Sequence, residues 1–412
     1  MISASVGAAS VRPGSGSRIQ VVATVAPMKQ HSERMNGLGT TIFAEMSALA
    51  QRTGAVNLGQ GFPDTDGPAS VIEAAVAALR SGRNQYAPGP GVPELREAVA
   101  AHQWRFYGLD VDPDAEVVVT TGATEAVAAA LLGLVDPGDE VVVLEPYYDS
   151  YVAGIRMAGG VRRPVTLRAP DFRLDVSQLR AAVSSRTRAV LLNSPHNPTG
   201  TVLDARELRA VADVAIEHDL VVITDEVYEH LTFDGAVHLP IATLPGMAER
   251  TLSISSAGKT FAFTGWKVGW ATGPAPLVQA VLAAKQFMTF TSGAPLQPAI
   301  AGALQLPDEV FTEHTARLQA RRDQLCAGLT EAGFGVRVPQ GTYFVTTDIS
   351  PLGYDDGVEF CLALPERAGV VAVPHQVFYD DVEAGRPLVR WAFCKQESVI
   401  DEAVTRLRRA FG

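Results

Sequence analysis

Short runs that are apolar at nearly every position alternate with helical patterns through the middle of this chain. Five such runs occupy residues 116–121, 140–144, 188–193, 220–224 and 251–255. A strand that is apolar throughout has both faces buried, and helices between consecutive strands supply the cover. The pattern therefore predicts an α/β fold with a large, doubly wound and mostly parallel sheet.

A different pattern begins after Pro295. It predicts a long amphipathic helix over 307–332, strands over 343–347 and 388–393, and a closing helix over 397–411. Near the other end, a helical period from about residue 40 stops at Gly54, and a strand over 55–58 follows. We expect residues 34–60 and 296–412 to form a smaller α+β domain beside a large domain of residues 61–295. Residues 1–33 are expected to be a disordered extension.

The charge balance of the chain is acidic, with 34 Lys and Arg against 45 Asp and Glu, a net charge of −11. Nucleic acids and anionic membranes repel such a surface, so neither is expected as a partner. The longest apolar run, residues 126–135, is far shorter than the roughly 20 residues that cross a bilayer, so no membrane span is expected.

The three cysteines, Cys326, Cys361 and Cys394, stand far apart and form no CxxC pair. This spacing argues against a disulfide framework and against a zinc site, and it favours a cytoplasmic location. The histidines show no spacing typical of metal ligands either. We therefore expect no bound metal.

Lysine is rare in this chain: arginine supplies most of the 34 basic residues, and the lysines are Lys29, Lys259, Lys267, Lys285 and Lys395. An arginine side chain stays protonated and cannot form an imine, so a lysine retained at a strand end suggests a chemical role. Lys259 follows the fifth predicted strand. Lys285 and Lys395 are expected to be solvated or ion-paired.

Ligands of open α/β sheets bind outside the carboxyl ends of the strands, so the residues at these ends are candidates for a site. The turn 121–124 leads into a helix, whose free N–H groups favour an anion such as phosphate. An aromatic ring, polar groups, a carboxylate and a lysine follow the other strands: Tyr148, Asn197, Asp225, Tyr228, Ser256 and Lys259.

This set of groups suits pyridoxal phosphate. A lysine amine supplies the imine, and a carboxylate keeps the ring nitrogen protonated so that the ring can accept electrons. A Walker A loop at Gly258-Lys259-Thr260 is rejected, because that motif needs a glycine where this chain has Ser253.

Six ordered motifs resemble those of class I aminotransferases of the pyridoxal-phosphate-dependent transferase fold type I. They are Gly59-Gln60-Gly61-Phe62-Pro63, Gln85-Tyr86, Asn197-Pro198-Thr199-Gly200, Asp225-Glu226-Val227-Tyr228, Ser255-Ser256-Ala257-Gly258-Lys259-Thr260-Phe261 and Gly265-Trp266-Lys267-Val268-Gly269. The resemblance covers roughly residues 34–412. It implies that residues 61–295 bind pyridoxal phosphate and that the chain is a transaminase of amino acids and keto acids.

The resemblance also implies a role for each matching residue. Lys259, Asp225 and Tyr228 would be catalytic: Lys259 binds the cofactor and moves the proton at the substrate Cα, Asp225 pairs with the ring nitrogen, and Tyr228 holds the ring oxygen. Arg390 would bind the substrate α-carboxylate beside Gly61. Further contacts to cofactor would come from Ala123, Thr124, Tyr148, Asn197, Ser256 and Lys267, with Asn197 also near the substrate, and Tyr86 would reach the neighbouring subunit's site. A homodimer with shared active sites is thus expected.

Within the family, the stretches 35–43 and 56–64 resemble two groups. The nearer resemblance is to actinobacterial N-succinyldiaminopimelate aminotransferases of lysine and diaminopimelate biosynthesis, which implies glutamate and 2-oxoglutarate as the amino donor and its product. The other is to the kynurenine, glutamine and methionine aminotransferases. A cysteine-S-conjugate β-lyase activity at the same site remains open. A transcription regulator would need a DNA-binding domain ahead of this one, and the short N-terminal tail shows no helix-turn-helix.

Overall fold

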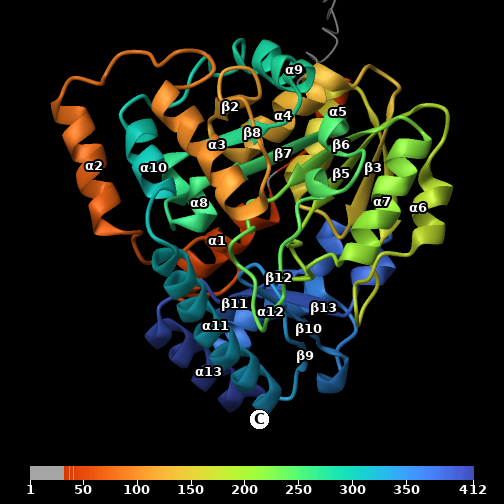
Figure 1. The fold of residues 1–412 in the computed structure, drawn as a ribbon. Helices are drawn as coiled ribbons and strands as arrows, with labels where there is room; N and C mark the ends of the chain where they lie inside the picture. The colour runs from red at the N-terminus through yellow and green to blue at the C-terminus, as the bar shows by residue number, and fades with distance from the viewer. Residues whose placement is uncertain (1–31, 37, 40) are drawn as a thin grey trace, which may run out of the picture.

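Seven strands form the large sheet, in the order β2-β8-β7-β6-β5-β3-β4, in a computed structural model that describes residues 32–36, 38, 39 and 41–412. Figure 1 shows this sheet in the upper part of the molecule. The five predicted strands correspond to β2 (Val117–Thr120), β3 (Glu140–Glu145), β5 (Thr187–Asn193), β6 (Val221–Asp225) and β7 (Thr251–Ser256). The predicted α/β fold is confirmed, whereas the predicted extension lies almost wholly outside the described residues.

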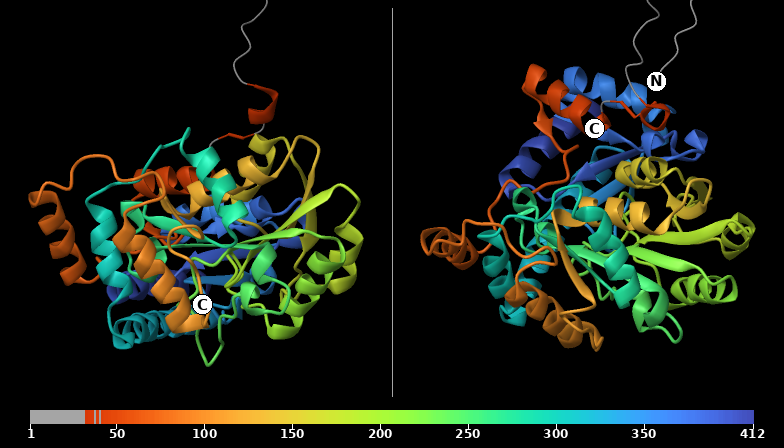
Figure 2. Two further views of the ribbon diagram at one scale, coloured as in Figure 1. Left: turned by 45° about the horizontal axis from the view of Figure 1, so that its top comes forward. Right: turned by 90° about the horizontal axis from the view of Figure 1, so that it is seen from above.

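Helices cover both faces of this sheet, as strands that are apolar throughout require. In β3, Val141 and Val143 pack with α4 (Gly122–Leu134), α5 (Asp149–Ala158) and α9 (Ala275–Lys285). The alternate residues Val142 and Leu144 pack with α6 (Val176–Ala182) and α7 (Ala205–Glu217). Neighbouring residues of a strand point to opposite faces, so an apolar run needs cover on both. Figure 2 shows the helices on either side of the sheet.

Two strands of the large sheet were not predicted. The first, β4 (Val161–Thr166), contains Arg162, Arg163 and Pro164 and lies at the edge beside β3, where charged residues and proline are tolerated. The second, β8 (Gly269–Thr272), has only four residues and runs antiparallel to both of its neighbours, β2 and β7. The sheet is therefore mostly, and not wholly, parallel.

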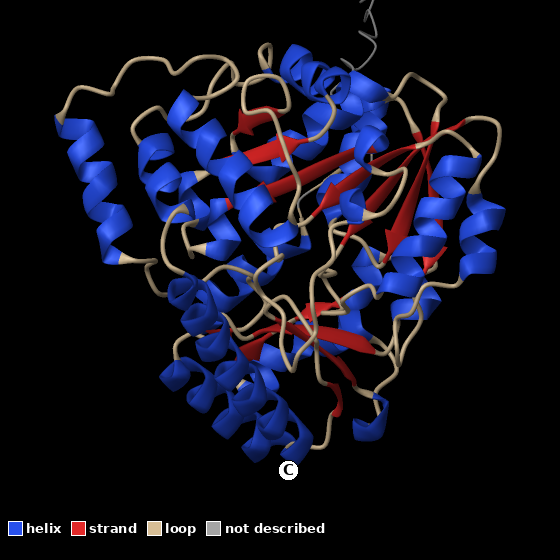
Figure 3. Cartoon of the chain, in the orientation of Figure 1, coloured by secondary structure: helices blue, strands red, loops and turns tan. Residues whose placement is uncertain are grey.

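The smaller sheet has four antiparallel strands in the order β12-β13-β10-β9, and a parallel pair β1-β11 lies beside it. Figure 3 shows these strands in the lower part of the molecule. The strands are β1 (Val56–Asn57), β9 (Gly335–Arg337), β10 (Phe344–Asp348), β11 (Val370–Val371), β12 (Val373–Pro374) and β13 (Leu388–Ala392). The helices that pack on them are α1 (Ile42–Thr53), α11 (Asp308–Glu331), α12 (Gly357–Ala368) and α13 (Glu397–Phe411).

The predicted helices 307–332 and 397–411 agree with α11 and α13 to within one residue. The 24-residue α11 is long but rich in charged residues. Within the described part of the chain, no helix is both long and apolar enough to cross a membrane.

The packing of α10 (Leu296–Leu304) determines where the smaller domain begins. Ala299 and Ile300 of α10 lie in one hydrophobic cluster with Val71 of α2 (Ala69–Arg80) and Leu95 of α3 (Pro93–Tyr107). That cluster also holds side chains of β2 and β8, so α10 belongs with the large sheet. We therefore propose that the smaller domain comprises residues 34–60 and about 308–412, and does not begin at residue 296.

Candidate active site

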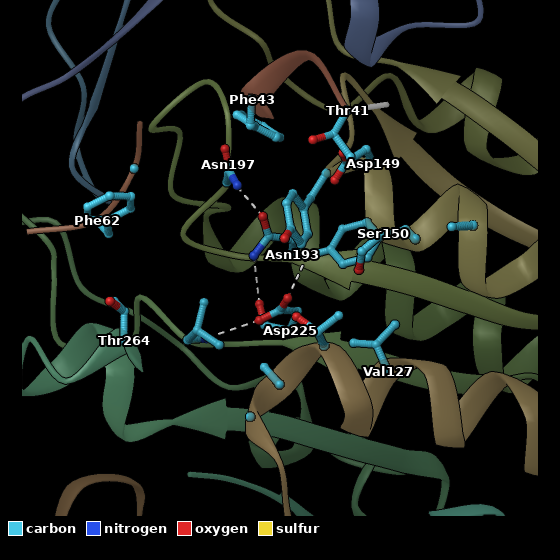
Figure 4. Close-up of a pocket in the computed structure, with 18 of the residues that line it drawn as sticks. Thr41, Phe43, Phe62, Val127, Asp149, Ser150, Asn193, Asn197, Asp225 and Thr264 are labelled. Carbon is cyan, nitrogen blue, oxygen red and sulfur yellow. Dashed lines mark hydrogen bonds between the residues drawn. The ribbon is translucent and has the colours of Figure 1, made fainter. Parts of the chain in front are cut away.

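A cavity of about 1060 Å³ opens at the carboxyl ends of the large-sheet strands. The N-terminus of α4 and a residue of β13 also line it. Figure 4 shows its centre. Every predicted site residue except Tyr86 lines this cavity: Gly61, Ala123, Thr124, Tyr148, Asn197, Asp225, Tyr228, Ser256, Lys259, Lys267 and Arg390. Residues that are hundreds of positions apart in sequence thus meet at the place where the sheet topology predicts a ligand.

Asp225 is the last residue of β6, and its carboxylate is buried. The Tyr151 hydroxyl donates to its Oδ2 at 2.7 Å, and the backbone N–H of Val227 donates to its Oδ1 at 3.3 Å. Burial raises the pKa of Asp225, and these two hydrogen bonds oppose that rise. Among the described residues no lysine or arginine forms an ion pair with Asp225, so this carboxylate could pair with a cationic group of a ligand.

Asn193 fixes the backbone between Asp225 and Asn197. Its Nδ2 donates to the carbonyl oxygen of Asp225 at 2.8 Å, and its Oδ1 accepts from the N–H of Asn197 at 2.7 Å. Figure 4 shows these residues joined in this order. The pairing of Asn193 with Asp225 across β5 and β6 sets this arrangement. Asn193 was not predicted as a site residue.

The N-terminus of α4 and the Lys267 ammonium form a site for an anion. Gly122 begins α4 with φ of +77°, and an added Cβ there would lie 3.1 Å from the Nζ of Lys267. A Cβ at Gly269 would lie only 2.7 Å from the carbonyl carbon of Gly122. The positive φ at Gly122 and the close backbone approach at Gly269 explain why these positions hold glycine. Free N–H groups, an ammonium and the Ser256 hydroxyl around one cavity suit a phosphate group.

Lys259 lies in α8 (Ala257–Thr260), directly after β7. Its Nζ donates to the Tyr343 hydroxyl at 2.6 Å, and that hydroxyl donates to the carbonyl oxygen of Gly61 at 2.6 Å. Burial lowers the pKa of Lys259 to about 8, which favours the neutral, nucleophilic amine. Tyr343 was missed from sequence, because a tyrosine that begins a strand-like run is indistinguishable from a core residue.

Arg390 lies in the middle of β13 and is 1 % exposed. Its Nη1 donates to the side-chain oxygen of Asn197 at 3.0 Å, and its Nη2 donates to the carbonyl oxygen of Gly59 at 3.1 Å. The Nε of Arg390 has no partner among the described residues, and no carboxylate there forms an ion pair with it. The guanidinium is also 4.0 Å from the ring centroid of Phe344. Burial lowers its pKa to about 10, so a bound carboxylate would compensate an unusually isolated cation.

Backbone carbonyl groups of the turn 59–62 hold three cationic side chains in place. The carbonyl oxygen of Gly59 accepts from Arg390 at 3.1 Å. The carbonyl oxygen of Gly61 accepts from Lys259 at 3.5 Å, and that of Phe62 accepts from Lys395 at 2.8 Å. The turn therefore connects the amine and the guanidinium of the site through a short, hydrogen-bonded piece of backbone.

Lys285 and Lys395, which were expected to be solvated or ion-paired, contradict that expectation. Lys285 is fully buried and donates to the carbonyl oxygens of Gly89 and Phe290 at 2.8 and 3.2 Å. Lys395 is 6 % exposed. Neither is solvated, and within the described residues neither forms an ion pair, so the expectation of solvated or ion-paired lysines is wrong. Both act as donors to turns whose carbonyl groups would otherwise lack partners.

Tyr148 and Tyr86, both predicted site residues, differ in position. Tyr148 precedes α5, lines the cavity and contacts the Tyr151 ring edge-on, with ring centroids 5.7 Å apart. Burial raises its pKa. Tyr86 is 83 % exposed, contacts Phe290 edge-on at 5.3 Å, and does not line the cavity. The structure of one chain thus brings Tyr148 to the site and leaves Tyr86 at the surface.

The groups around the cavity fit pyridoxal phosphate. Lys259 offers an amine of lowered pKa, and Asp225 offers a buried carboxylate without a cationic partner in the described chain. The α4 N-terminus with Lys267 suits the phosphate, and Tyr148 offers an aromatic face. Arg390 lines the cavity and has no carboxylate partner among the described residues, which suits a site for an anion.

Comparison with known proteins identifies the relatives of this chain. The profile of the family described as aminotransferase class I and II matches residues 53–407. A probable N-succinyldiaminopimelate aminotransferase of Mycobacterium tuberculosis is 56 % identical over 385 residues, which cover 91 % of this chain and 97 % of that protein. A methionine aminotransferase of Escherichia coli is 42 % identical over 372 residues, or 90 % of this chain and 96 % of its own length.

Solved structures give the same relationship. The N-succinyldiaminopimelate aminotransferase of Mycobacterium tuberculosis superposes with a TM-score of 0.90 at 56 % identity and covers 92 % of this chain and 100 % of that one. An aspartate aminotransferase of Thermus thermophilus superposes with a TM-score of 0.85 at 36 % identity, over 93 % of this chain and 100 % of its own.

Proposed function

Because this chain belongs to the class I and II aminotransferases, we propose that it transfers an amino group from glutamate to N-succinyl-2-amino-6-oxopimelate, in lysine and diaminopimelate biosynthesis. The products are N-succinyl-L,L-diaminopimelate and 2-oxoglutarate. The family makes the protein a pyridoxal-phosphate-dependent transaminase of amino acids and keto acids. The choice of substrate is supported by 56 % identity, over 91 % of the chain, with a probable N-succinyldiaminopimelate aminotransferase.

The buried guanidinium of Arg390 is the observation that carries the proposal. It donates to Asn197 and Gly59, lines the cavity and has no carboxylate partner in the described chain, which supports binding of an incoming carboxylate. A charge-assisted pair of this kind contributes roughly 1.5–3 kcal/mol. The planar fork also orients the bound amino acid, because a bidentate pair fixes rotation about the carboxylate.

Lys259 would act at the substrate Cα. When bound, pyridoxal phosphate supplies an electrophilic carbonyl for amines and a ring that withdraws electrons from the adjacent carbon. With its pKa lowered to about 8, the Lys259 amine can accept a proton from Cα and return one near neutral pH. The Tyr343 hydroxyl holds this amine 2.6 Å away and limits the positions that Nζ can reach.

Asp225 and the α4 N-terminus would hold the two ends of the cofactor. Asp225, backed by the Tyr151 hydroxyl, would face the ring nitrogen, and Tyr228 and Asn197 would face the ring oxygen. Ala123, Thr124, Ser256 and Lys267 would bind the phosphate, and Tyr148 would cover the ring. All of these side chains line one cavity, which supports their acting together.

A homodimer with shared active sites forms part of the proposal. Tyr86, Phe287 and Phe290 expose 83 %, 86 % and 49 % of their surface, and Tyr86 contacts Phe290. Such a group of exposed aromatic residues is typical of a surface that another chain covers. We also propose a cytoplasmic location, which the three buried, unpaired cysteines support.

A broad-specificity aminotransferase is the second candidate, and the wall of the cavity favours it. Apart from Arg390, Lys259 and Lys267, the described residues that line the cavity include no basic side chain, and several are apolar: Met35, Leu38, Ile42, Phe43, Met157, Val377 and Phe378. An apolar wall suits methionine or an aromatic side chain. The 42 % identity with a methionine aminotransferase supports the same alternative.

The test is a half-reaction screen by absorbance. Purified holoenzyme receives glutamate, N-succinyl-L,L-diaminopimelate, kynurenine, methionine and glutamine one at a time, and conversion of the cofactor to its amine form is followed. Rapid conversion by glutamate and the succinylated substrate alone supports the proposal. Rapid conversion by methionine, kynurenine or glutamine, with the succinylated substrate inert, supports the broad alternative. Release of pyruvate and ammonia from a cysteine S-conjugate without any keto acid would instead indicate a β-lyase.

A further inference from the structure

A buried polar cluster lies beside the loop that carries Tyr228, outside the cavity described above. His102 of α3 and His230 place their Nε2 atoms 2.8 Å apart. The ligand atoms of His102, Glu229 and His230 all lie within 4.8 Å of one another. His102 and His230 are 128 positions apart, so no spacing in the sequence could show this cluster.

Two buried carboxylates in and beside the cluster have no lysine or arginine partner among the described residues. Glu229 is 4 % exposed, and the hydrogen bonds it accepts within the described chain come from the hydroxyls of Tyr107 and Ser255. Glu226, outside the three-residue cluster, is 2 % exposed, accepts from the Thr224 hydroxyl and lies 3.6 Å from the Nε2 of His238. In the part of the chain that the structure describes, neither carboxylate forms an ion pair with lysine or arginine. Burying carboxylates without a compensating cation is costly.

His102 and His230 lie against each other, and within the described residues neither ring forms an ion pair with a carboxylate. The Nδ1 of His102 has no hydrogen-bond partner among the described residues, although the side chain is 1 % exposed. Two imidazoles and a carboxylate with their ligand atoms in one small volume are the donor set of a metal site.

We propose that His102, Glu229 and His230 bind one divalent transition-metal ion, for which zinc is the best fit. Zinc binds histidine nitrogen at about 2.0–2.1 Å, which in a tetrahedral site places two nitrogens about 3.3 Å apart. The two rings would therefore separate by about half an ångström from 2.8 Å. A His₂Glu set leaves the fourth position for water, and the partly exposed side of His230 gives access to it.

The bound ion would connect α3 to the loop 226–230. It would add two positive charges next to Glu229, and so offset the cost of burying that carboxylate. Because the site holds no residue of the cavity, its role is to fix the loop that carries Tyr228 and not to take part in transamination. The sequence predicts a metal-free protein, because its cysteines and histidines show no ligand spacing. His230 is one of those histidines, and its neighbour in space, His102, lies 128 positions away in the chain.

The first test needs no variant. Holoenzyme is incubated with equimolar Zn²⁺ or Co²⁺, passed through gel filtration, and its metal content is measured by mass spectrometry. We expect about one ion per chain and, for Co²⁺, intense visible d–d bands of a tetrahedral site. Retention of no metal by the wild-type holoenzyme, together with no such bands, would overturn the proposal. A sulfur-to-cobalt charge-transfer band would also overturn it, because it would place the ion on the cysteines.

The second test assigns the ligands. His102→Gln and His230→Gln should each weaken zinc binding by at least about tenfold, while the exposed His218→Gln, the matched control, should bind as the wild type does. Equal binding by all three variants would assign the metal to another place and overturn the proposal. Zinc should also raise the melting temperature of the wild type and not that of His102→Gln. If either variant fails to fold, the cobalt spectrum of the wild type decides.

Discussion

The hydroxyl of Tyr151 donates a 2.7 Å hydrogen bond to the carboxylate of Asp225, and both side chains are buried. Tyr151 lies on α5 and Asp225 ends β6, so the bond joins a helix on one face of the sheet to the strand end at the site. Burial raises the pKa of Tyr151 well above its usual value, and Asp225 raises it further. The phenol therefore stays protonated and remains a donor.

Replacing Tyr151 by Phe should weaken cofactor binding. The lost hydrogen bond lets the pKa of Asp225 rise further, so less carboxylate is available for the ring nitrogen. A hydrogen bond to a charged group is worth about 1.5–3 kcal/mol, so the Kd for pyridoxal phosphate should rise by roughly 10- to 100-fold. Fluorescence titration of the apoenzyme measures it. Asp225→Asn should lose more affinity than Tyr151→Phe, and the reverse order would contradict this account.

Arg390→Ala should raise the KM for every amino acid by a similar factor. All substrates share the α-carboxylate, and loss of a charge-assisted pair of about 1.5–3 kcal/mol corresponds to roughly 10- to 100-fold. Steady-state kinetics with glutamate and with two further donors checks this. Arg390→Lys is the matched control, since it keeps the charge but not the planar fork, and it should recover only part of the loss. An unchanged KM in Arg390→Ala would mean that another group holds the carboxylate.

The reactivity of the Lys259 amine should depend on pH with a midpoint near 8. Burial lowers the pKa of Lys259 to about 8, so half of the amine is neutral there, whereas an ordinary lysine is almost wholly protonated. The rate at which apoenzyme captures pyridoxal phosphate should therefore rise with pH and level off above about 8. Stopped-flow absorbance follows the capture, and Lys259→Ala sets the baseline. A rate still rising steeply at pH 10 would contradict the lowered pKa.

Stability should fall in mild acid, because several buried histidines cannot be protonated in the folded state. His196 is 1 % exposed, and burial lowers its pKa to about 3. The unfolded chain protonates this ring near pH 6.5, so the stability contribution is complete above about 6.5 and is lost as pH falls toward 3. Urea denaturation at pH 7 and pH 5 measures the slope of the free energy of unfolding against pH. His196→Gln should flatten it, whereas the exposed His218→Gln should leave it unchanged.

Tyr86→Phe should speed the loss of cofactor only if a second chain completes the site. The hydroxyl of Tyr86 is exposed in one chain, so the loss of one charge-assisted hydrogen bond across an interface would raise the dissociation rate by roughly tenfold. Dialysis of holoenzyme against an excess of a carbonyl trap measures that rate. Tyr354→Phe, outside the cavity, is the control. Equal rates for Tyr86→Phe and the wild type would argue against shared sites.

Most of the large sheet could be predicted, because a strand that is apolar on both faces leaves an unmistakable run such as residues 140–144. The edge strand β4 was not predicted, because Arg162 and Arg163 can face solvent at the edge of the sheet and the strand therefore has no apolar run. The short β8 was not predicted because its four residues give too short an apolar run. Periodicity reports burial, so strands that are short or at an edge give little signal.

The candidate site was predictable where a strand end places a distinctive residue, as at Asp225 and Lys259. Arg390, on β13 of the smaller sheet, was predicted through its resemblance to the family's arginine, whereas Tyr151 and Tyr343 belong to none of the matching motifs and were not predicted. Tyr151 and Tyr343 contact Asp225 and Lys259 only through the tertiary fold, and each follows an ordinary apolar pattern in the sequence. Only the distances in the structure show that Tyr151 donates to Asp225 and that Tyr343 accepts from Lys259.

The turn 59–62 fixes how far the Lys259 amine stands from the Arg390 guanidinium, because the backbone carbonyl groups of that turn bind both side chains. A substrate must present its reacting carbon to the amine while its carboxylate stays on the guanidinium. An α-amino acid carries both groups on one carbon and can satisfy both anchors at once. A β- or ω-amino acid with a longer path between the groups cannot, unless this backbone lengthens. The four residues of this turn thus select substrates by the position of their amino group relative to the carboxylate, independently of any pocket for the side chain.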